Sequence, residues 1–396
     1  MKTQHILSST ILTALVTGTT NLVAKPLVTD YGTATSAYKD AYLTGYFNLD
    51  SGNQAQTSYD LDLTVDYEKV FTSADRNTKF EFAGEVSRSR GSGSTDKAVS
   101  KYQIFGTTAT VDNYFQADSN GSFWYGKAEV GSKKGQDDLF SKVTIGIGYG
   151  RVTNVTPMAR AIRVIEELRK RGNLTSEPKD SSYQTVAKII AKEDEYRSKY
   201  GAEDYEQYWV VAIEKALQDS GTVKDGGNLG TMAILKSYDI LVNERIFTRK
   251  YGWLVRAGVG AVLTDYNGEN GKPALEVNAE YHLPLSNATQ FSNKANLIAT
   301  LKDDNNNYDF KNTMSLTHEL SDRIDWENKW VLDYNSFSAS NNITSNALTS
   351  TFRYYLTNQL DFNTTVKLKS IDDNIDDNGN DDLDKSLFIG ITYRLK

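Results

Sequence analysis

The stretch that decides the fold lies at residues 59–68 and reads YDLDLTVDYE. Apolar and aromatic side chains occupy its odd-numbered positions, from Tyr59 to Tyr67, and acidic or hydroxyl side chains occupy its even-numbered positions, from Asp60 to Glu68. Because successive side chains of a β-strand point to opposite faces, this strand has one apolar face and one wet face. About ten residues with this alternation are enough for a strand to cross a membrane within a closed barrel.

The same alternation returns on both sides of this stretch. Working outward, we count about fourteen strands, with about six in residues 39–151 and about eight in residues 250–396. The clearest further copies have apolar residues at most of the alternate positions in the runs 80–86, 139–149, 251–263, 275–281, 324–334, 360–368 and 387–395. They predict an all-β antiparallel barrel that crosses a membrane as strands.

The connections distinguish this barrel from a soluble β-sandwich, whose strands also alternate. Counted from the first strand, the odd-numbered connections are long and polar or acidic, whereas even-numbered ones such as 284–287, 320–323 and 357–359 are very short. Long loops at one end and short turns at the other, with an even number of strands, are typical of outer-membrane barrels. Aromatic residues near strand ends, such as Phe71 and Tyr281, suit the interfacial girdles of such barrels.

The last strand carries a more specific signal. Gly390, Tyr393 and Leu395 stand in the segment GITYRLK, where aromatic and apolar residues alternate after the glycine. This segment resembles the C-terminal strand of Gram-negative outer-membrane β-barrel proteins such as the porins, although members of that family commonly finish on an aromatic residue and this chain finishes on Lys396. The resemblance implies recognition by the barrel-assembly machinery, location in the outer membrane of a Gram-negative bacterium, and contact with its lipid and lipopolysaccharide.

The first residues predict the route to that membrane. Lys2 is followed by the uncharged stretch 6–23, and Ala24 offers a cleavage site, so residues 1–24 are expected to be a secretory signal peptide. The Ser and Thr residues of this stretch argue against a membrane-spanning helix, which needs about 20 predominantly apolar residues. We expect residues 25–38 to form a short periplasmic segment before the first strand.

Composition and charge exclude several classes of function. The 396 residues include 44 basic and 51 acidic ones, for a net charge of -7, which argues against a nucleic-acid partner because phosphate binding needs clustered positive charge. The chain has no cysteine and three histidines, so we expect neither a thiolate nucleophile nor a zinc site.

The histidines and the acidic run at 372–384 are weak candidates for a catalytic or metal-binding site. His282 lies on a polar phase facing the lumen, whereas His318 lies on an apolar phase, opposite to Ser315. The acidic run fails as a calcium loop because Lys385 stands where the twelfth-position Glu is required, which leaves a solvated loop or loose divalent binding at the cell surface. We predict no catalytic residue, no metal site and no cofactor, and hence not an enzyme.

In residues 152–249 the apolar residues no longer recur at every second position. Thr156 and Pro157 are typical of a helix start, and apolar residues then recur at three-to-four spacing as far as Gly172. Similar patterns predict helices near 180–190, 203–220 and 231–247, and about four amphipathic helices can form a small bundle. The parity of the connections places this α-helical insertion, between the sixth and seventh strands, on the periplasmic side, unless it folds up into the lumen as a plug.

Two sets of residues are candidates for a functional site. The first set is glycines on the inner phase of the strands flanking the insertion, which either contact the helices as a plug or relieve crowding and bends in the barrel: Gly146, Gly148, Gly150, Gly252, Gly258 and Gly260. The second set is charged residues expected to line the lumen: Asp60, Asp62, Asp66, Glu68, Glu81, Glu85, Arg256, Lys294, Arg353, Lys367 and Arg394. The acidic ones come early and the basic ones mostly late, so they either create a transverse field that orients polar solutes or simply keep the lumen wet.

These features predict a porin-like channel or transporter for small hydrophilic solutes, restricted by the helical insertion. The alternative is a membrane-anchored scaffold whose periplasmic helical bundle binds a partner protein. In that case Tyr205, Tyr208 and Trp209 would supply a contact surface, whereas in a simple bundle they belong to its core.

Overall fold

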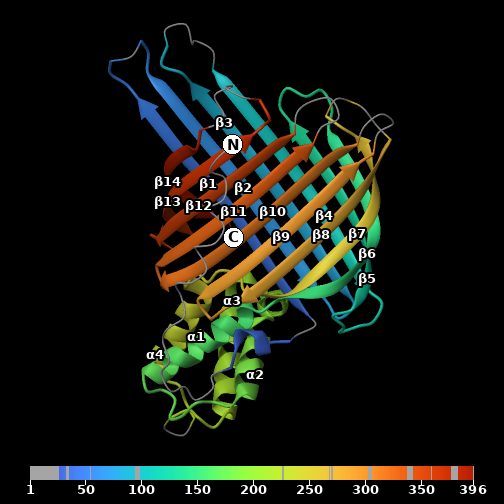
Figure 1. The fold of residues 1–396 in the computed structure, drawn as a ribbon. Coiled ribbons are helices and arrows are strands. Elements are labelled where there is room, and N and C mark those ends of the chain that lie inside the picture. Colours follow the sequence, from blue (N-terminus) through green and yellow to red (C-terminus); the bar gives the residue numbers. More distant parts are fainter. Residues whose placement is uncertain are drawn as a thin grey trace, which may run out of the picture.

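A computed structural model shows a closed antiparallel β-barrel with a helical domain at one end (Figure 1). It describes residues 26–32, 35–53, 55–93, 99–224, 227–266, 268, 271–301, 306–336, 342–357, 359–375 and 382–395. The predicted signal peptide, residues 1–24, and positions 376–381 of the acidic run lie outside the described residues.

Fourteen strands form the barrel, and each pairs with its sequence neighbours until β1 and β14 close the ring. The predicted antiparallel barrel with helices between the sixth and seventh strands is therefore confirmed. β1 begins within the segment predicted to precede the barrel, and β6 continues past residue 151. The strands are β1 (Ser36–Asp50), β2 (Ser58–Thr72), β3 (Arg76–Arg90), β4 (Ser100–Tyr114), β5 (Ser122–Lys133), β6 (Phe140–Asn154), β7 (Lys250–Thr264), β8 (Lys272–Pro284), β9 (Thr289–Thr300), β10 (Asn307–Ser321), β11 (Ile324–Ser336), β12 (Ile343–Tyr355), β13 (Leu360–Asp372) and β14 (Asp384–Arg394).

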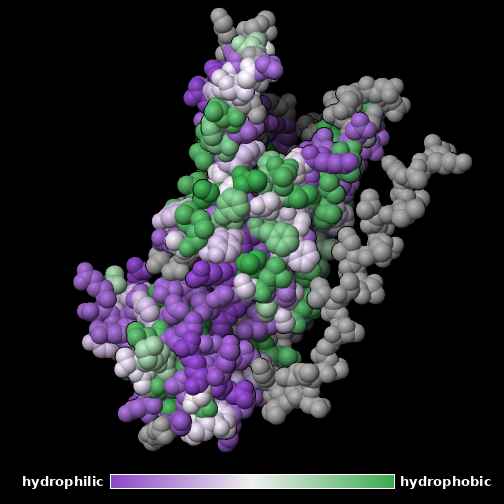
Figure 2. Space-filling model, turned by 90° about the vertical axis from the view of Figure 1, so that its left-hand side faces the viewer, coloured by the Kyte–Doolittle hydropathy of each residue, from purple (hydrophilic) through white to green (hydrophobic). Residues whose placement is uncertain are grey.

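The two faces of the wall differ as the alternation predicts. On β6, Ile145 and Ile147 are each 67% exposed on the outside, whereas Lys142 and Thr144 on the other face are each 2% exposed. Figure 2 shows apolar side chains gathered over the barrel wall, above a largely hydrophilic helical domain. An apolar outer surface of this extent needs a membrane or a partner to cover it.

The helical domain lies at the end of the barrel that carries the even-numbered connections (Figure 1). Other connections at this end are short, such as residues 73–75, 285–288 and 322–323. The short helix η1 (Val28–Asp30) precedes β1, and Val28 and Tyr31 pack into the core of the helical domain. The asymmetry between the two ends thus follows the pattern seen in the sequence.

The helical domain is a small bundle between β6 and β7. It contains α1 (Thr156–Lys170), α2 (Asp180–Ile190), α3 (Glu193–Asp219), α4 (Thr231–Tyr238) and the π-helical turn η2 (Asp239–Asn243). Its core includes Met158 and Ile165 of α1 and Trp209 of α3, whose indole nitrogen donates to the backbone oxygen of Ile189 at 2.8 Å. Of the three aromatic residues noted in α3, Tyr205 and Trp209 are buried, whereas Tyr208 is 45% exposed.

Two helices differ from their predicted bounds. α3 begins at Glu193 instead of residue 203, because two helical segments join across Gly201, whose φ of 83° only glycine adopts without strain. The fourth helix, predicted to reach Phe247, ends at Tyr238 and continues as one π-helical turn. Residues 244–249, which we call the strap, leave the helix and bind the barrel instead.

The glycines of β6 and β7 accommodate side chains of β5 and a neighbouring backbone, so of the two alternatives the structure shows relief of crowding in the barrel and not contact with the helices. A Cβ atom on Gly148 would lie 2.3 Å from the ring of fully buried Phe123, and one on Gly146 would lie 2.6 Å from the ring of Tyr125. A Cβ atom on any of the other four glycines would also meet atoms of the barrel, either of Tyr125 or of strands β6 and β7. These glycines are Gly150, Gly252, Gly258 and Gly260. Rings of β5 therefore occupy the space that side chains at these positions of β6 would need.

We expect Gly148→Ala to lower the free energy of unfolding by about 1–3 kcal/mol, because its methyl group would overlap the Phe123 ring and the Val255 carbonyl oxygen. Gly106 of β4 is the matched control, since nothing lies within 4 Å of a Cβ at that position. Urea unfolding followed by tryptophan fluorescence measures both variants. Equal stability of Gly148→Ala and Gly106→Ala would contradict this assignment.

Candidate functional site

The lumen wall is the first element of the candidate site. The strand register puts all eleven predicted lumen residues on the inner phase, with the acidic ones on β2 and β3 and the basic ones spread over β7, β9 and β12–β14. Asp66 of β2, for example, interacts electrostatically with Lys329 of β11 and Arg353 of β12. An acidic wall thus faces a basic wall across part of the lumen.

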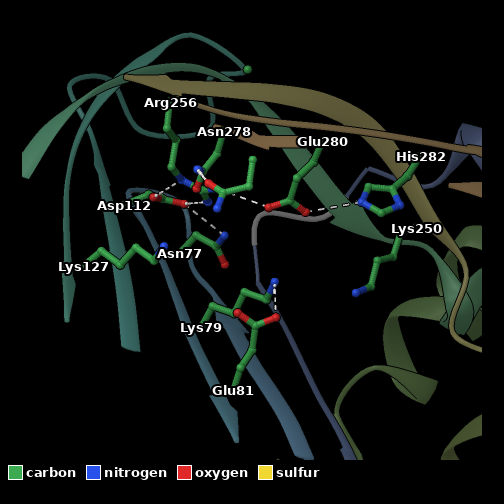
Figure 3. A network of polar contacts seen from close by, with 12 residues as sticks. Asn77, Lys79, Glu81, Asp112, Lys127, Lys250, Arg256, Asn278, Glu280 and His282 are labelled. Carbon is green, nitrogen blue, oxygen red and sulfur yellow. Dashed lines mark hydrogen bonds and ion pairs between the residues drawn. The ribbon is translucent and has the colours of Figure 1, made fainter. Parts of the chain in front are cut away.

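A buried ion cluster crosses the lumen in its lower half, toward the helical domain (Figure 3). At its centre, Arg256 of β7 binds both carboxylate oxygens of Asp112 of β4, at 2.9 and 2.7 Å, and one oxygen of Glu280 of β8, at 3.1 Å. Asn77 of β3 adds a hydrogen bond to Asp112 at 3.3 Å. Bidentate pairing of this kind is geometrically specific and strong, and it holds the two sides of the lumen together.

The cluster continues toward β2. Lys250, the first residue of β7, donates to both oxygens of Glu68 at 3.1 and 3.2 Å, and Lys79 of β3 binds Glu68 at 3.4 Å and Glu81 at 2.7 Å. Strands β3–β6 separate β2 from β7 along the ring, so the Lys250–Glu68 contact spans the lumen. The cavity among these side chains measures about 30 Å³, which holds about one water molecule.

A second ion cluster lies higher on the same side of the barrel. Glu276 of β8 binds Lys127 of β5 at 2.5 Å and Lys142 of β6 at 3.0 Å, and Glu129 binds the same two lysines. Glu276 and Lys142 are 1% and 2% exposed as side chains. Buried charges of this kind tolerate desolvation only when they are paired, so both clusters fill this part of the lumen with interlocked side chains.

His282 and His318 have different surroundings. His282 lies next to the first cluster, where one ring nitrogen contacts Ser292 at 2.9 Å and the other contacts Glu280 at 3.3 Å. It is 2% exposed, and the cavity beside Glu280 is too small for a substrate, so His282 links β8 to β9. His318 contacts the Thr289 hydroxyl at 2.8 Å.

The strap is the second element of the site, and it crosses the mouth of the barrel at the helical end. Its Arg245 pairs with Asp361 of β13. Its Thr248 hydroxyl donates to Asp40 of β1 at 2.8 Å. The guanidinium of Arg353 of β12 lies 5.6 Å from the ring centroid of Phe247. Because β7, which follows the strap, lies far around the ring from β12, β13 and β1, these contacts span the opening.

Glu319 of β10 is the main anchor of the helical domain. One of its oxygens accepts from Arg249 of the strap at 2.8 Å, and the other pairs with Arg163 of α1. Arg249 is fully buried and also donates to the backbone oxygen of Asn287 at 3.2 Å. One wall carboxylate therefore binds the strap and the first helix together.

The start of the strap is held by contacts within the helical domain. Lys236 of α4 donates to Asp239 at 2.8 Å and to Glu244 at 2.9 Å. The hydrogen bond from Lys236 lowers the pKa of the Asp239 carboxyl. The first residue of the strap, Glu244, is thus bound to α4. Its last residue is followed directly by Lys250, a member of the first ion cluster.

Sequence reasoning missed most members of this site. Lys79, Asp112, Glu276 and Glu280 occupy inner-phase positions, so parity alone could have added them to the lumen set. No comparable signal marked Arg245, Arg249 or Glu319, because Arg245 fell within the helix predicted for 231–247 and the other two lie beside strand ends, outside the alternating runs.

No described helix is both long and apolar enough to span a membrane. Among the residues that the structure describes, no group of three or more His, Asp or Glu side chains could hold a metal ion.

Comparison with known proteins adds limited information. Residues 245–355, from the strap to the end of β12, match the family described as "Protein of unknown function, DUF481". No curated protein matches the chain.

Among solved structures, the chain is similar to a loop L8 deletion mutant of OmpT, an outer membrane protein of Vibrio cholerae, with 8% identity over 91% of this chain and 100% of that one and a TM-score of 0.33. It is also similar to the outer membrane protein Omp33 of Acinetobacter baumannii (7% identity, 91% and 99% coverage, TM-score 0.30) and to OprB of Pseudomonas putida (8%, 91% and 93%, TM-score 0.34). Likenesses this low concern barrel architecture alone.

We expect Arg256→Gln to lower the free energy of unfolding by about 3–5 kcal/mol, because it leaves Asp112 buried without its cationic partner. Arg88→Gln on the outer phase of β3 is the control and should change stability little, since no ion pair is described for that side chain. Denaturant unfolding in the same detergent compares them. A loss below about 1 kcal/mol for Arg256→Gln, the range of exposed pairs, would show that the cluster does not hold the barrel together.

Proposed function

We propose that this protein is an outer-membrane channel for small hydrophilic solutes, closed at its periplasmic end by the helical domain. The observation that carries the proposal is the strap, which crosses the mouth of a charged lumen and binds the wall at β1, β10 and β13. The function rests on passage through the barrel and requires no covalent chemistry.

Location in a membrane is supported by the two faces of the wall. The outside carries exposed apolar side chains on successive strands, and the inside carries ion pairs. Hydrocarbon demands that every backbone N–H and C=O group has a partner inside the protein, and a ring of paired strands meets that demand. The C-terminal strand and the asymmetric connections favour the outer membrane, with the helical domain in the periplasm.

A hydrophilic solute is favoured by the size and charge of the lumen. Barrels of about eight strands fill with side chains, and those of about sixteen leave an aqueous channel, so a fourteen-stranded barrel leaves space that must be closed by other means. Here the first ion cluster occupies the lower lumen, the second lies above it, and the strap covers the exit. Opposed acidic and basic walls above them would hold water and polar solutes and would disfavour apolar ones.

Opening would require the strap to leave its anchors. Those anchors are ion pairs to wall carboxylates, chiefly Glu319 and Asp361, which are buried beneath the helical domain. Release of the strap would also pull on Lys250 and so loosen the first ion cluster.

Single-channel conductance in a planar bilayer tests the proposal. We expect the double variant Glu319→Gln/Asp361→Asn to conduct several-fold more than the wild-type protein, because it removes the charges that hold Arg163, Arg245 and Arg249.

The control for this experiment is Asp333→Asn, an inner-wall carboxylate of β11 whose described ion pair is to Lys311 and not to the strap. It should conduct as the wild type does. Equal conductance of the two variants would show that the strap does not close the channel, and no conductance from any of them would refute the channel itself.

The alternative is a scaffold whose helical domain binds a periplasmic protein. It is favoured by an open groove of about 380 Å³ between α2 and α3, lined by Ser182, Thr185, Ala212 and Lys215 among others, and by the exposed side chains of Tyr208 and Val211 beside it. Absence of conductance, together with binding of a periplasmic protein that Ala212→Arg abolishes, would favour this function over a channel.

A further inference from the structure

The junction between β1 and β14 is much shorter than any other junction of the barrel. Its pairing runs only from Tyr42 opposite Arg394 to Gly45 opposite Ile391. The next strand pair, β1 and β2, stays in register from Ser36 opposite Thr72 to Asp50 opposite Ser58. Every other junction pairs ten residues or more.

Above this level, β14 lies beside β1 without being paired to it in a backbone ladder. From Asp384 to Gly390, its described residues pair with β13 on one side and with no strand on the other. Backbone groups cannot remain unpaired in hydrocarbon, but they are tolerated where they border water. Along this stretch the two strands are joined by side-chain packing instead of a backbone ladder, so the unpaired groups of β14 need water from the lumen as their partner.

Apolar side chains flank this opening on its outer surface. Phe47 and Leu49 of β1 are 60% and 56% exposed, and Leu387 and Ile389 of β14 are 64% and 56% exposed. Lipid chains would therefore reach the opening from outside, while the polar lumen lies directly behind it.

Side chains, not hydrogen bonds, close the opening on the lumen side. The rings of Tyr46 and Phe388 pack across it with their centroids 5.3 Å apart. An aromatic contact of this kind separates by simple rotation of side chains, whereas any other junction would have to lose a whole ladder of backbone hydrogen bonds.

Groups that can bind an anion lie on the inner wall at the same level. Lys329, Thr349, Lys367 and Ser386 are directly opposed to one another across β11, β12, β13 and β14. The ion pairs described for this part of the wall, Lys311–Asp333 and Arg353–Glu327, do not include Lys367. The Thr349 hydroxyl already donates to the backbone oxygen of Lys329, so the ammonium groups of Lys329 and Lys367 are the groups here that suit phosphate oxygens.

We propose that the β1–β14 seam above Gly45 is a lateral gate for a phospholipid with an anionic headgroup, which places its headgroup at Lys367 and its acyl chains in the membrane. Opening of the Tyr46–Phe388 contact admits the lipid to the edge of the lumen. This property is separate from the passage of solutes along the barrel axis.

Quenching by brominated lipids tests the gate, and the absence of native cysteine makes single-site labelling simple. A bimane label is attached at Ser386→Cys, beside the seam, and in a separate protein at Thr349→Cys, on the inner face of β12 where both junctions are fully paired. Each is reconstituted into vesicles of phosphatidylglycerol brominated in its acyl chains. We expect at least severalfold stronger quenching at position 386 than at position 349, and stronger still with Phe388→Ala.

Vesicles of equally brominated phosphatidylcholine test the headgroup. Quenching at position 386 should be weaker with this lipid, and Lys367→Gln should remove the difference between the two lipids. Since only the lipid carries bromine, free phosphate in the lumen cannot produce the signal. Equal quenching at positions 386 and 349 would overturn the gate. Quenching at position 386 that changes neither with the charge of the lipid nor with Lys367→Gln would overturn the preference for an anionic headgroup.

Discussion

The whole structure depends on the pairing of backbone hydrogen-bond groups around a closed ring. A strand in hydrocarbon has no water to satisfy its N–H and C=O groups, so it needs a strand on each side, and only closure supplies this for every strand. Closure then dictates the alternation of side chains, because one face of each strand must meet lipid and the other must meet the lumen. The short β1–β14 seam is the place where this constraint is met least completely.

The helical domain and the first ion cluster are connected because the strap runs directly into Lys250. The strap ends where β7 begins, and Lys250 at that point binds Glu68 across the lumen. Movement of the helices away from Glu319 would therefore be transmitted to the cluster centred on Arg256. In the channel that we propose, opening would exchange buried ion pairs for hydrated ones without unfolding the wall.

The barrel, the number of its strands and the side of the wall on which the lumen residues lie could all be predicted from the strand alternation. All three depend on local sequence. Contacts across the lumen were not predictable: Arg256 and Asp112 lie on strands separated by two others, and only the shape of the closed ring brings them together. The glycines were read correctly as sites of close approach, but the approaching group, Phe123, lies on the adjacent strand. Residues 244–247 were predicted to continue the fourth helix, and the contacts of this segment with the wall override that pattern.

The central claim, a membrane barrel with its helical domain in the periplasm, is tested most directly by labelling single cysteines on intact cells with a membrane-impermeant maleimide. Lys134→Cys lies in the exposed connection between β5 and β6, and Lys215→Cys lies on the exposed face of α3. The account predicts that position 134 reacts on intact cells and that position 215 reacts only after the outer membrane is permeabilised. Reaction of position 215 on intact cells, with position 134 protected, would contradict it.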